Sequence, residues 1–144
     1  MASFRRELTT DLSIEDTWTV VTDLTGPGYW GRRLRAFSPD DVPVVEGTRL
    51  TSATLVADVV VVADVTVVRC EPGPHGWLVL HTESEIGDST ENVRVVATPG
   101  RGTVVEYEVS VDSRVDESAM RMWGGQFADE CRDGLVAALA GSAA

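Results

Sequence analysis

The stretch from Gly47 to Asp112 is a succession of β-branched strands separated by short turn signals, and a single long amphipathic helix follows it, ending near Ala140. Alternating polarity in runs rich in Val and Thr predicts antiparallel strands, whereas apolar residues spaced by three and four predict a helix. A curved antiparallel sheet can wrap around one helix and leave a hollow between the two. We therefore expect the function of this chain to lie in that hollow.

The first part of the chain supplies the other elements. Phe4 to Leu12 alternates as a strand, and Ser13 provides an N-cap for a short helix that is broken at Thr25. Tyr29 to Arg33 predicts one more short turn of helix, and Leu34 to Phe37 predicts a brief strand. The predicted order is one strand, two helices, six strands and a long helix, which is an α+β architecture with a seven-stranded curved antiparallel sheet in one domain.

Hairpin register decides which side chains face the hollow, because a slip of one residue turns a whole strand over. For the last hairpin we expect a loop from Gly100 to Gly102, since its final position favours a left-handed residue. This loop sets Val95 opposite Tyr107. It also sets Arg94 opposite Glu108, as an exposed ion pair.

The predicted lining of the hollow is apolar, with scattered hydroxyl groups and few ionisable side chains. Arg6, Arg69 and Glu91 are the exceptions, each near the end of a strand. His81 and Glu83 are expected on the outer face. Acid–base catalysis needs a titratable group within reach of the substrate, whereas an apolar lining suits ligand binding. We assign no catalytic residue, and the residues expected to contact a ligand are Arg6, Trp30, Ser52, Thr54, Thr82, Tyr107, Met120, Trp123 and Phe127.

Composition excludes several classes of partner. A net charge of −11 disfavours nucleic acids and anionic membranes, because phosphates would be repelled. The densest apolar run is far shorter than the roughly 20 residues that span a bilayer, and the first residues show no signal-peptide core, so we expect a cytoplasmic protein. Two histidines far from any cysteine pair predict no zinc site, and no cofactor is expected. Cys70 and Cys131 are expected to be reduced thiols.

A set of short segments punctuates the chain in a characteristic order: Leu12 to Trp18, Asp23, Tyr29 and Trp30, Gly47 to Leu50, Val67 to Pro72, Gly102 to Val105, and the closing helix. This order resembles the polyketide cyclase/dehydratase-like family of the START and birch-pollen-allergen (SRPBCC) superfamily, which has the helix-grip fold. The resemblance covers nearly all of residues 1–144 and concerns structure rather than chemistry. It implies a cavity for a lipid- or polyketide-like ligand, which some members cyclise or dehydrate.

Several features keep two interpretations open. Arg6 either anchors a ligand carboxylate or pairs with an acid near a strand end, and the second is favoured. Tyr107 either polarises a ligand carbonyl or belongs to the core. The adjacent Gly124 and Gly125 cost roughly 1 kcal/mol each in a helix, which is explained by room for a ligand, by a bend, or by close packing.

Three functions from different classes follow. The first is binding of a small hydrophobic or amphipathic molecule, and the second is a cyclase or dehydratase acting in the same cavity. The third is an interaction protein, a monomer or a homodimer, whose valines Val60, Val62 and Val68 face a partner. The direction of His81 separates the first two, because an inward histidine beside Arg94 would favour an enzyme.

Overall fold

The computed structural model describes residues 2–24, 30, 33–36, 44–56, 59–100, 102–113 and 117–143. Its strands form one seven-stranded sheet in the order β1-β7-β6-β5-β4-β3-β2, with every neighbouring pair antiparallel. The predicted α+β class and strand number are confirmed. The elements are β1 (Ala2–Thr10), α1 (Ile14–Val21), β2 (Arg33–Ala36), β3 (Arg49–Val56), β4 (Val59–Glu71), β5 (His75–Ser84), β6 (Gly87–Thr98), β7 (Gly102–Ser113) and α2 (Glu117–Ala143).

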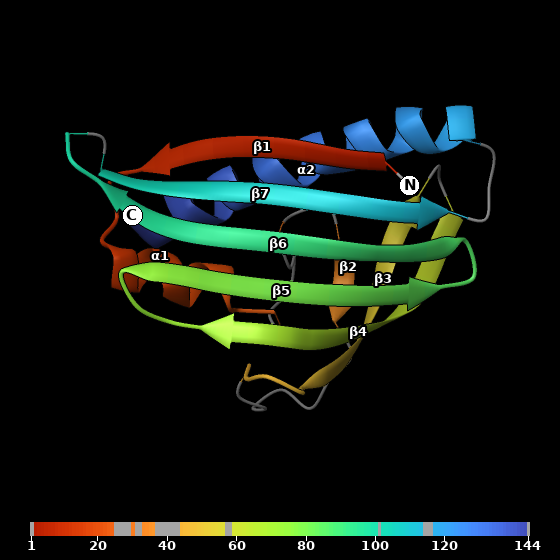
Figure 1. The fold of residues 1–144 in the computed structure, drawn as a ribbon, viewed down its shortest axis with the longest axis horizontal. Helices are drawn as coiled ribbons and strands as arrows, with labels where there is room; N and C mark the ends of the chain where they lie inside the picture. Colours follow the sequence, from red (N-terminus) through yellow and green to blue (C-terminus); the bar gives the residue numbers. More distant parts are fainter. Residues whose placement is uncertain are drawn as a thin grey trace.

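The long helix α2 lies along one face of the sheet and packs on β1 and β7 (Figure 1). The short helix α1 packs on β6 and on α2, at the end of the sheet opposite the first turn of α2. The second short helix predicted from Tyr29 to Arg33 falls almost wholly on residues outside the described part of the chain. Arg33 itself already belongs to β2.

We call the face of the sheet that packs on α2 the inner face. Its strands contribute buried side chains at every second position, as the alternating sequence predicts. The core contains Leu8 from β1, Leu50 from β3, Val65 and Val67 from β4, Leu78 and Leu80 from β5, Val93 and Val95 from β6, Val105, Tyr107 and Val109 from β7, and Ala128, Cys131, Leu135 and Leu139 from α2.

The hairpin between β6 and β7 differs from the predicted register by two residues. Thr98 pairs with Gly102, so that the loop begins at Pro99, one residue earlier than predicted, and Val93 rather than Val95 lies opposite Tyr107. Gly100 and Gly102 both have positive φ, at 79° and 72°. Either glycine can therefore be the left-handed residue of the loop, and the sequence prediction considered only Gly102. A slip of two preserves the faces, and the predicted inward set of these strands is correct near its centre.

The same slip changes the cross-strand partner of Arg94 on the outer face. Arg94 lies opposite Glu106 and not opposite Glu108, while Glu108 forms an ion pair with Arg5 of β1 at 3.2 Å. The predicted pair of Arg94 with Glu108 is therefore wrong.

A bulge in β4 corrects the predicted direction of Arg69. The pairing with β5 shifts between Val67 and Arg69, so Val68 is an extra residue and strict alternation is interrupted there. Arg69 consequently faces outward, where its guanidinium stacks on the ring of Trp77 at 4.0 Å. The prediction that Arg69 lines the hollow is wrong, because a pattern of period two carries no sign of one inserted residue.

Two local predictions at α1 and at the cysteines agree with the structure. The Ser13 hydroxyl accepts a hydrogen bond from the backbone N–H of Asp16 at 3.1 Å, which is the expected N-cap. Cys70 and Cys131 are free thiols, and burial raises the pKa of Cys70. No helix in the described ranges is long and apolar enough to cross a membrane.

Candidate functional site

The inner face changes in character from one end of its strands to the other. Near α1 it is mainly apolar and tightly packed: the buried hydroxyl of Thr103 donates to the Leu12 carbonyl, and an added Cβ at Gly76 of β5 would lie 2.7 Å from the indole ring of Trp18. At the other end, where β5 turns into β6, hydroxyl side chains replace aliphatic ones. Thr82 lies opposite Ser89 there, and Thr82 also lies opposite Val65 of β4. The inner face is therefore packed at one end and polar at the other.

Two hydroxyl groups at the polar end are buried with no hydrogen-bond partner in the part of the chain that the structure describes. Ser52 is fully buried opposite Ala63, and its Oγ has no hydrogen-bond partner among the described residues. The Oγ1 of Thr82 is likewise buried and has no hydrogen-bond partner among these residues. Leaving a buried hydroxyl unsatisfied costs about 1–3 kcal/mol, so a group that satisfies both would be bound favourably here. At the packed end, the hydroxyl of Thr17 in α1 also has no partner within the described part of the chain.

A buried acid stands beside these hydroxyls. Glu91 of β6 is fully buried between Leu80 of β5 and Val109 of β7, and its Oε2 accepts a hydrogen bond from the hydroxyl of Tyr107 at 2.5 Å. Trp30 meets the Tyr107 ring edge-on, with 6.0 Å between the ring centroids. The sequence predicted Glu91 and Tyr107 on the inner face but not the bond between them, since a register error of two residues separates them.

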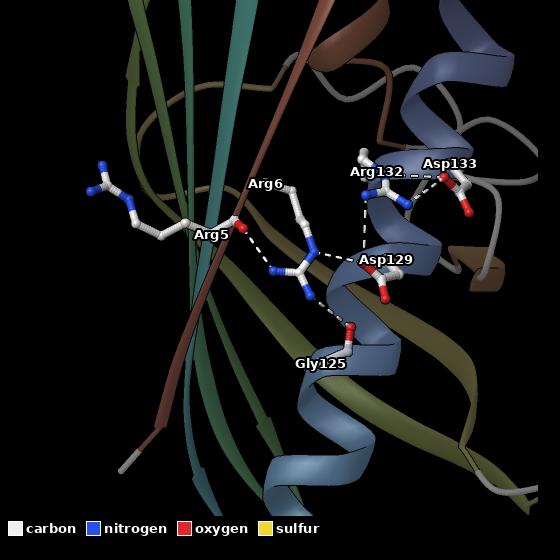
Figure 2. A network of polar contacts seen from close by, with 6 residues as sticks. All are labelled: Arg5, Arg6, Gly125, Asp129, Arg132 and Asp133. Carbon is white, nitrogen blue, oxygen red and sulfur yellow. Dashed lines mark hydrogen bonds and ion pairs between the residues drawn. The ribbon is translucent and has the colours of Figure 1, made fainter.

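Arg6 lies on the inner side of β1 but is held by α2 (Figure 2). Its Nε donates to Asp129 Oδ1 at 2.6 Å, and a terminal nitrogen donates to the Gly125 carbonyl at 3.3 Å. A third bond goes to the carbonyl of Arg5 at 2.7 Å. The favoured pairing of Arg6 with an acid is therefore seen, although the acid comes from the helix and not from a strand end. We call this set of contacts the β1–α2 clasp.

The clasp stabilises the protein at neutral pH, and this contribution to the free energy of unfolding is lost at acid pH. The hydrogen bond from Arg6, together with the charges of Arg6 and Arg132, holds the pKa of Asp129 below its ordinary value of 3.8, against an opposing effect of burial. A depressed carboxyl pKa contributes stability that is present above the unfolded pKa and is lost as pH falls through the folded pKa. Asp129→Asn should therefore lower the free energy of unfolding at pH 7, and the difference from wild type should shrink below pH 3.8.

Urea unfolding of both proteins between pH 2 and 7 measures this dependence. Asp133→Asn is the matched control, because Asp133 is exposed and forms its ion pair with Arg132 of the same helix. A pH-independent difference for Asp129→Asn would contradict the assignment.

The other predicted ligand contacts are distributed unevenly. Trp30 is 2% exposed and donates from Nε1 to the carbonyl of Val21 at 3.2 Å, at the end of α1. Phe127 is half-buried and packs against the core. Thr54 lies on β3 opposite Val61. The side chains of Thr54, Met120 and Trp123 lie outside the described part of the structure.

His81 points away from the hollow. Its side chain is 37% exposed on the outer face, Nδ1 lies 3.3 Å from the hydroxyl of Thr90, and Nε2 lies 3.5 Å from a carboxyl oxygen of Glu83. The predicted outward direction of His81 is confirmed. By the criterion drawn from the sequence, this direction favours binding over an enzyme.

The two glycines of α2 have different surroundings. An added Cβ at Gly124 would lie 2.4 Å from Cε2 of Phe4, whereas one at Gly125 would lie 3.7 Å from the nearest atom of the same ring. Gly124 thus leaves room for a side chain of β1. Close packing, one of the three explanations open from the sequence, is the one that the structure shows at this residue.

The outer face carries a polar groove of about 470 Å³ over β1, β7 and β6. Trp77 stands beside it, between the guanidinium groups of Arg69 and Arg94, which lie 4.0 and 4.2 Å from its ring centroid. Positive and negative side chains alternate along this groove, so it has no dominant charge to select a ligand. The groove is lined by Arg5, Arg6, Glu7, Asn92, Arg94, Glu106, Tyr107 and Glu108.

The valines predicted to face a partner are exposed: the exposed fractions of Val60, Val62 and Val68 are 54%, 60% and 46%.

Known structures share this architecture. No protein-family model matches the chain, and no curated protein matches it. A START superfamily protein from Mycobacterium smegmatis superposes with a TM-score of 0.71 at 12% identity, over 92% of this chain and 93% of that one. Ara h 8.0201 superposes with a TM-score of 0.67 at 9% identity, over 96% and 98% of the two chains.

The chain has a START-like helix-grip fold. The protein DR_A0006 from Deinococcus radiodurans adds a third example, with a TM-score of 0.65 at 18% identity over 94% of this chain and 92% of that one. At such identities the likeness establishes the fold, and the helix-grip prediction from the sequence is confirmed. Function has to be argued from the residues of this chain.

Proposed function

We propose that this protein binds a small hydrophobic or amphipathic molecule between the inner face of its sheet and α2. The observation that carries the proposal is the pair of buried hydroxyls at Ser52 and Thr82, which have no hydrogen-bond partner among the described residues, on a mainly apolar face. Ligand sites are typically apolar with a few polar groups that fix orientation. The helix-grip fold supports this location, because in the superfamily that the sequence resembles the ligand lies between the sheet and the long helix.

Side chains of β3, β5 and β7 form the wall of the proposed site, and the first half of α2 forms its roof. Phe4 pairs with Val109, so Gly124, which touches Phe4, lies at the same level of the sheet as Glu91. The residues of α2 before Gly124 then lie toward the polar end, where Met120 and Trp123 are proposed to contact the ligand. Arg6 is proposed to hold this roof in place through Asp129.

A polyketide cyclase or dehydratase in the same site is the second candidate. The observation that favours it is the bond between Tyr107 and Glu91, which places a titratable group and a phenol together on the inner face. The outward His81 and the clasped Arg6 leave fewer polar groups for this chemistry than the sequence allowed. Binding is therefore the better supported function. A cytoplasmic location, a single domain and the choice between monomer and homodimer stay predictions.

Blocking the proposed site should abolish ligand uptake. Thr82→Trp places a large ring on the inner face, and we expect uptake of the fluorescent probe 1-anilinonaphthalene-8-sulfonate to fall by at least about tenfold, because the space beside Ser52 and Glu91 is filled. Thr66→Trp is the matched control, since Thr66 lies on the neighbouring strand opposite the outward His81. It should leave uptake unchanged.

Native mass spectrometry of the purified protein gives an independent measurement, as the mass of a co-purifying small molecule. Circular dichroism of each variant verifies that it is folded. The proposal fails if the wild-type protein takes up neither probe nor natural ligand, or if Thr82→Trp and Thr66→Trp behave alike.

A further inference from the structure

We infer that the polar groove on the outer face binds a small zwitterion, such as a free α-amino acid, with the ligand's carboxylate at Arg94 and its ammonium group at Glu106. The site is separate from the proposed ligand site, because it lies on the face of the sheet that points away from α2. Arg5, which lines the groove, lies on the side of β1 opposite the helix (Figure 2). The groove has a volume of about 470 Å³, within the range of pockets that hold small ligands.

Arg94 supplies a positive charge that is held in place without an acid bound to it. Its guanidinium stacks on the ring of Trp77, on the neighbouring strand β5, at 4.2 Å from the ring centroid. Within the described part of the chain it forms no hydrogen bond and no ion pair. Stacking occupies the flat face of a guanidinium and leaves the N–H groups at its edge, which can donate to both oxygens of a carboxylate.

Glu106 supplies the opposite charge from β7. It lies directly opposite Arg94, yet the two side chains form no ion pair, because the guanidinium of Arg94 leans toward Trp77 on the other neighbouring strand. Glu106 is half-buried, and its carboxylate has no hydrogen-bond or ion-pair partner among the residues that the structure describes. Elsewhere in the groove Arg5 and Glu108 neutralise each other at 3.2 Å. Stacking on Trp77 therefore leaves Arg94 and Glu106 as separated charges of opposite sign.

Asn92 adds a hydrogen-bond donor beside Arg94. Its Oδ1 accepts a hydrogen bond from Nε1 of Trp77 at 3.1 Å, so its amide NH₂ group is the part that can donate to a ligand in the groove. Asn92 and Arg94 are two residues apart on one strand and share its outer face.

These groups favour a ligand that carries both charges. The groove has no dominant charge, so an anion at Arg94 would also face the carboxylate of Glu106, and a cation at Glu106 would face Arg94. Like charges brought together in this way oppose binding. A zwitterion places a carboxylate at the donors and an ammonium group at the acceptor, and so satisfies both side chains.

The test uses glycine, the smallest α-amino acid, together with acetate and methylammonium, which each carry one of its charges. Binding is followed by the NMR signal of the indole N–H of Trp77, which is bonded to Asn92 of the groove; Trp77→Phe identifies this signal by its loss. At neutral pH glycine should bind at least about tenfold more tightly than either single-charge probe, because it makes charge-assisted hydrogen bonds at both ends.

Three variants assign the roles of the side chains. Arg94→Met keeps an unbranched side chain beside Trp77 and removes the charge, so glycine should bind at least about tenfold more weakly. Glu106→Gln should weaken the binding of glycine and not that of acetate. Arg69→Met is the matched control, since Arg69 also stacks on Trp77, at 4.0 Å, but does not line the groove. It should leave the affinity for glycine unchanged.

The opposite results would overturn the inference. They are equal affinities for glycine and acetate, equal losses in Arg94→Met and Arg69→Met, or a Trp77 signal that none of the three probes moves. None of these outcomes bears on ligand binding between the sheet and α2, because that site is tested by Thr82→Trp on the inner face.

Discussion

Trp30→Ala is expected to lower the free energy of unfolding by about 3–5 kcal/mol, the range found when a buried tryptophan is truncated. Trp30 is 2% exposed, and its Nε1–H donates to the carbonyl of Val21, which ends α1. Its ring edge also meets Tyr107. One side chain thus joins the end of α1 to the centre of the inner face, and its removal opens a cavity while leaving a backbone carbonyl without this donor. Urea unfolding followed by circular dichroism measures the loss.

Trp30→Phe is the matched control. It keeps an aromatic ring of similar thickness but removes the N–H, so a smaller loss of about 1–2 kcal/mol is expected. A loss below about 1 kcal/mol for Trp30→Ala would show that Trp30 does not secure the core and would favour a role confined to the ligand.

Gly124→Ala should destabilise the protein, whereas Gly125→Ala should not. The new Cβ at Gly124 would overlap the ring of Phe4 at 2.4 Å, and overpacking of this kind costs about 1–3 kcal/mol. At Gly125 the nearest ring atom would be at an ordinary 3.7 Å, so the helix propensity of alanine should instead stabilise by up to roughly 1 kcal/mol. Adjacent positions in one helix are therefore expected to respond with opposite signs.

Phe4→Leu combined with Gly124→Ala tests the cause. Because the smaller side chain removes the overlap, the two changes together should cost less than the sum of their separate effects. Additive losses, or a stabilising Gly124→Ala, would show that the ring of Phe4 moves aside freely and would restore the interpretation of Gly124 as space for a ligand.

The alternation of side chains made the two faces of the sheet predictable. Val93, Tyr107, Leu80 and Val65 are buried as the pattern of period two indicates. The cross-strand partner of each residue was harder to predict. The loop between β6 and β7 can begin at Pro99 or at Gly100, and the two resulting registers differ by two residues, so every side chain stays on the same face. Thus the direction of these side chains was predicted correctly while the bond between Tyr107 and Glu91 was missed.

Other features depend on contacts that no local pattern encodes. The bulge at Val68 needs only one extra residue within a long valine-rich run, so nothing marks it in the sequence. The partner of Arg6 lies on the closing helix, and the fit of Gly124 depends on a ring from the first strand. Each of these is set by tertiary packing between segments far apart in the chain.

The β1–α2 clasp has a consequence for how the molecule is assembled. Arg6 and Asp129 are separated by 123 positions along the chain, and β1 reaches its place only by pairing with β7, the last strand to emerge during synthesis. Contacts between such distant segments slow folding, because a large loop must be closed before they form. Until these contacts form, the apolar inner face of the sheet is uncovered. A nascent chain would therefore be exposed to aggregation or to chaperone binding for most of its translation.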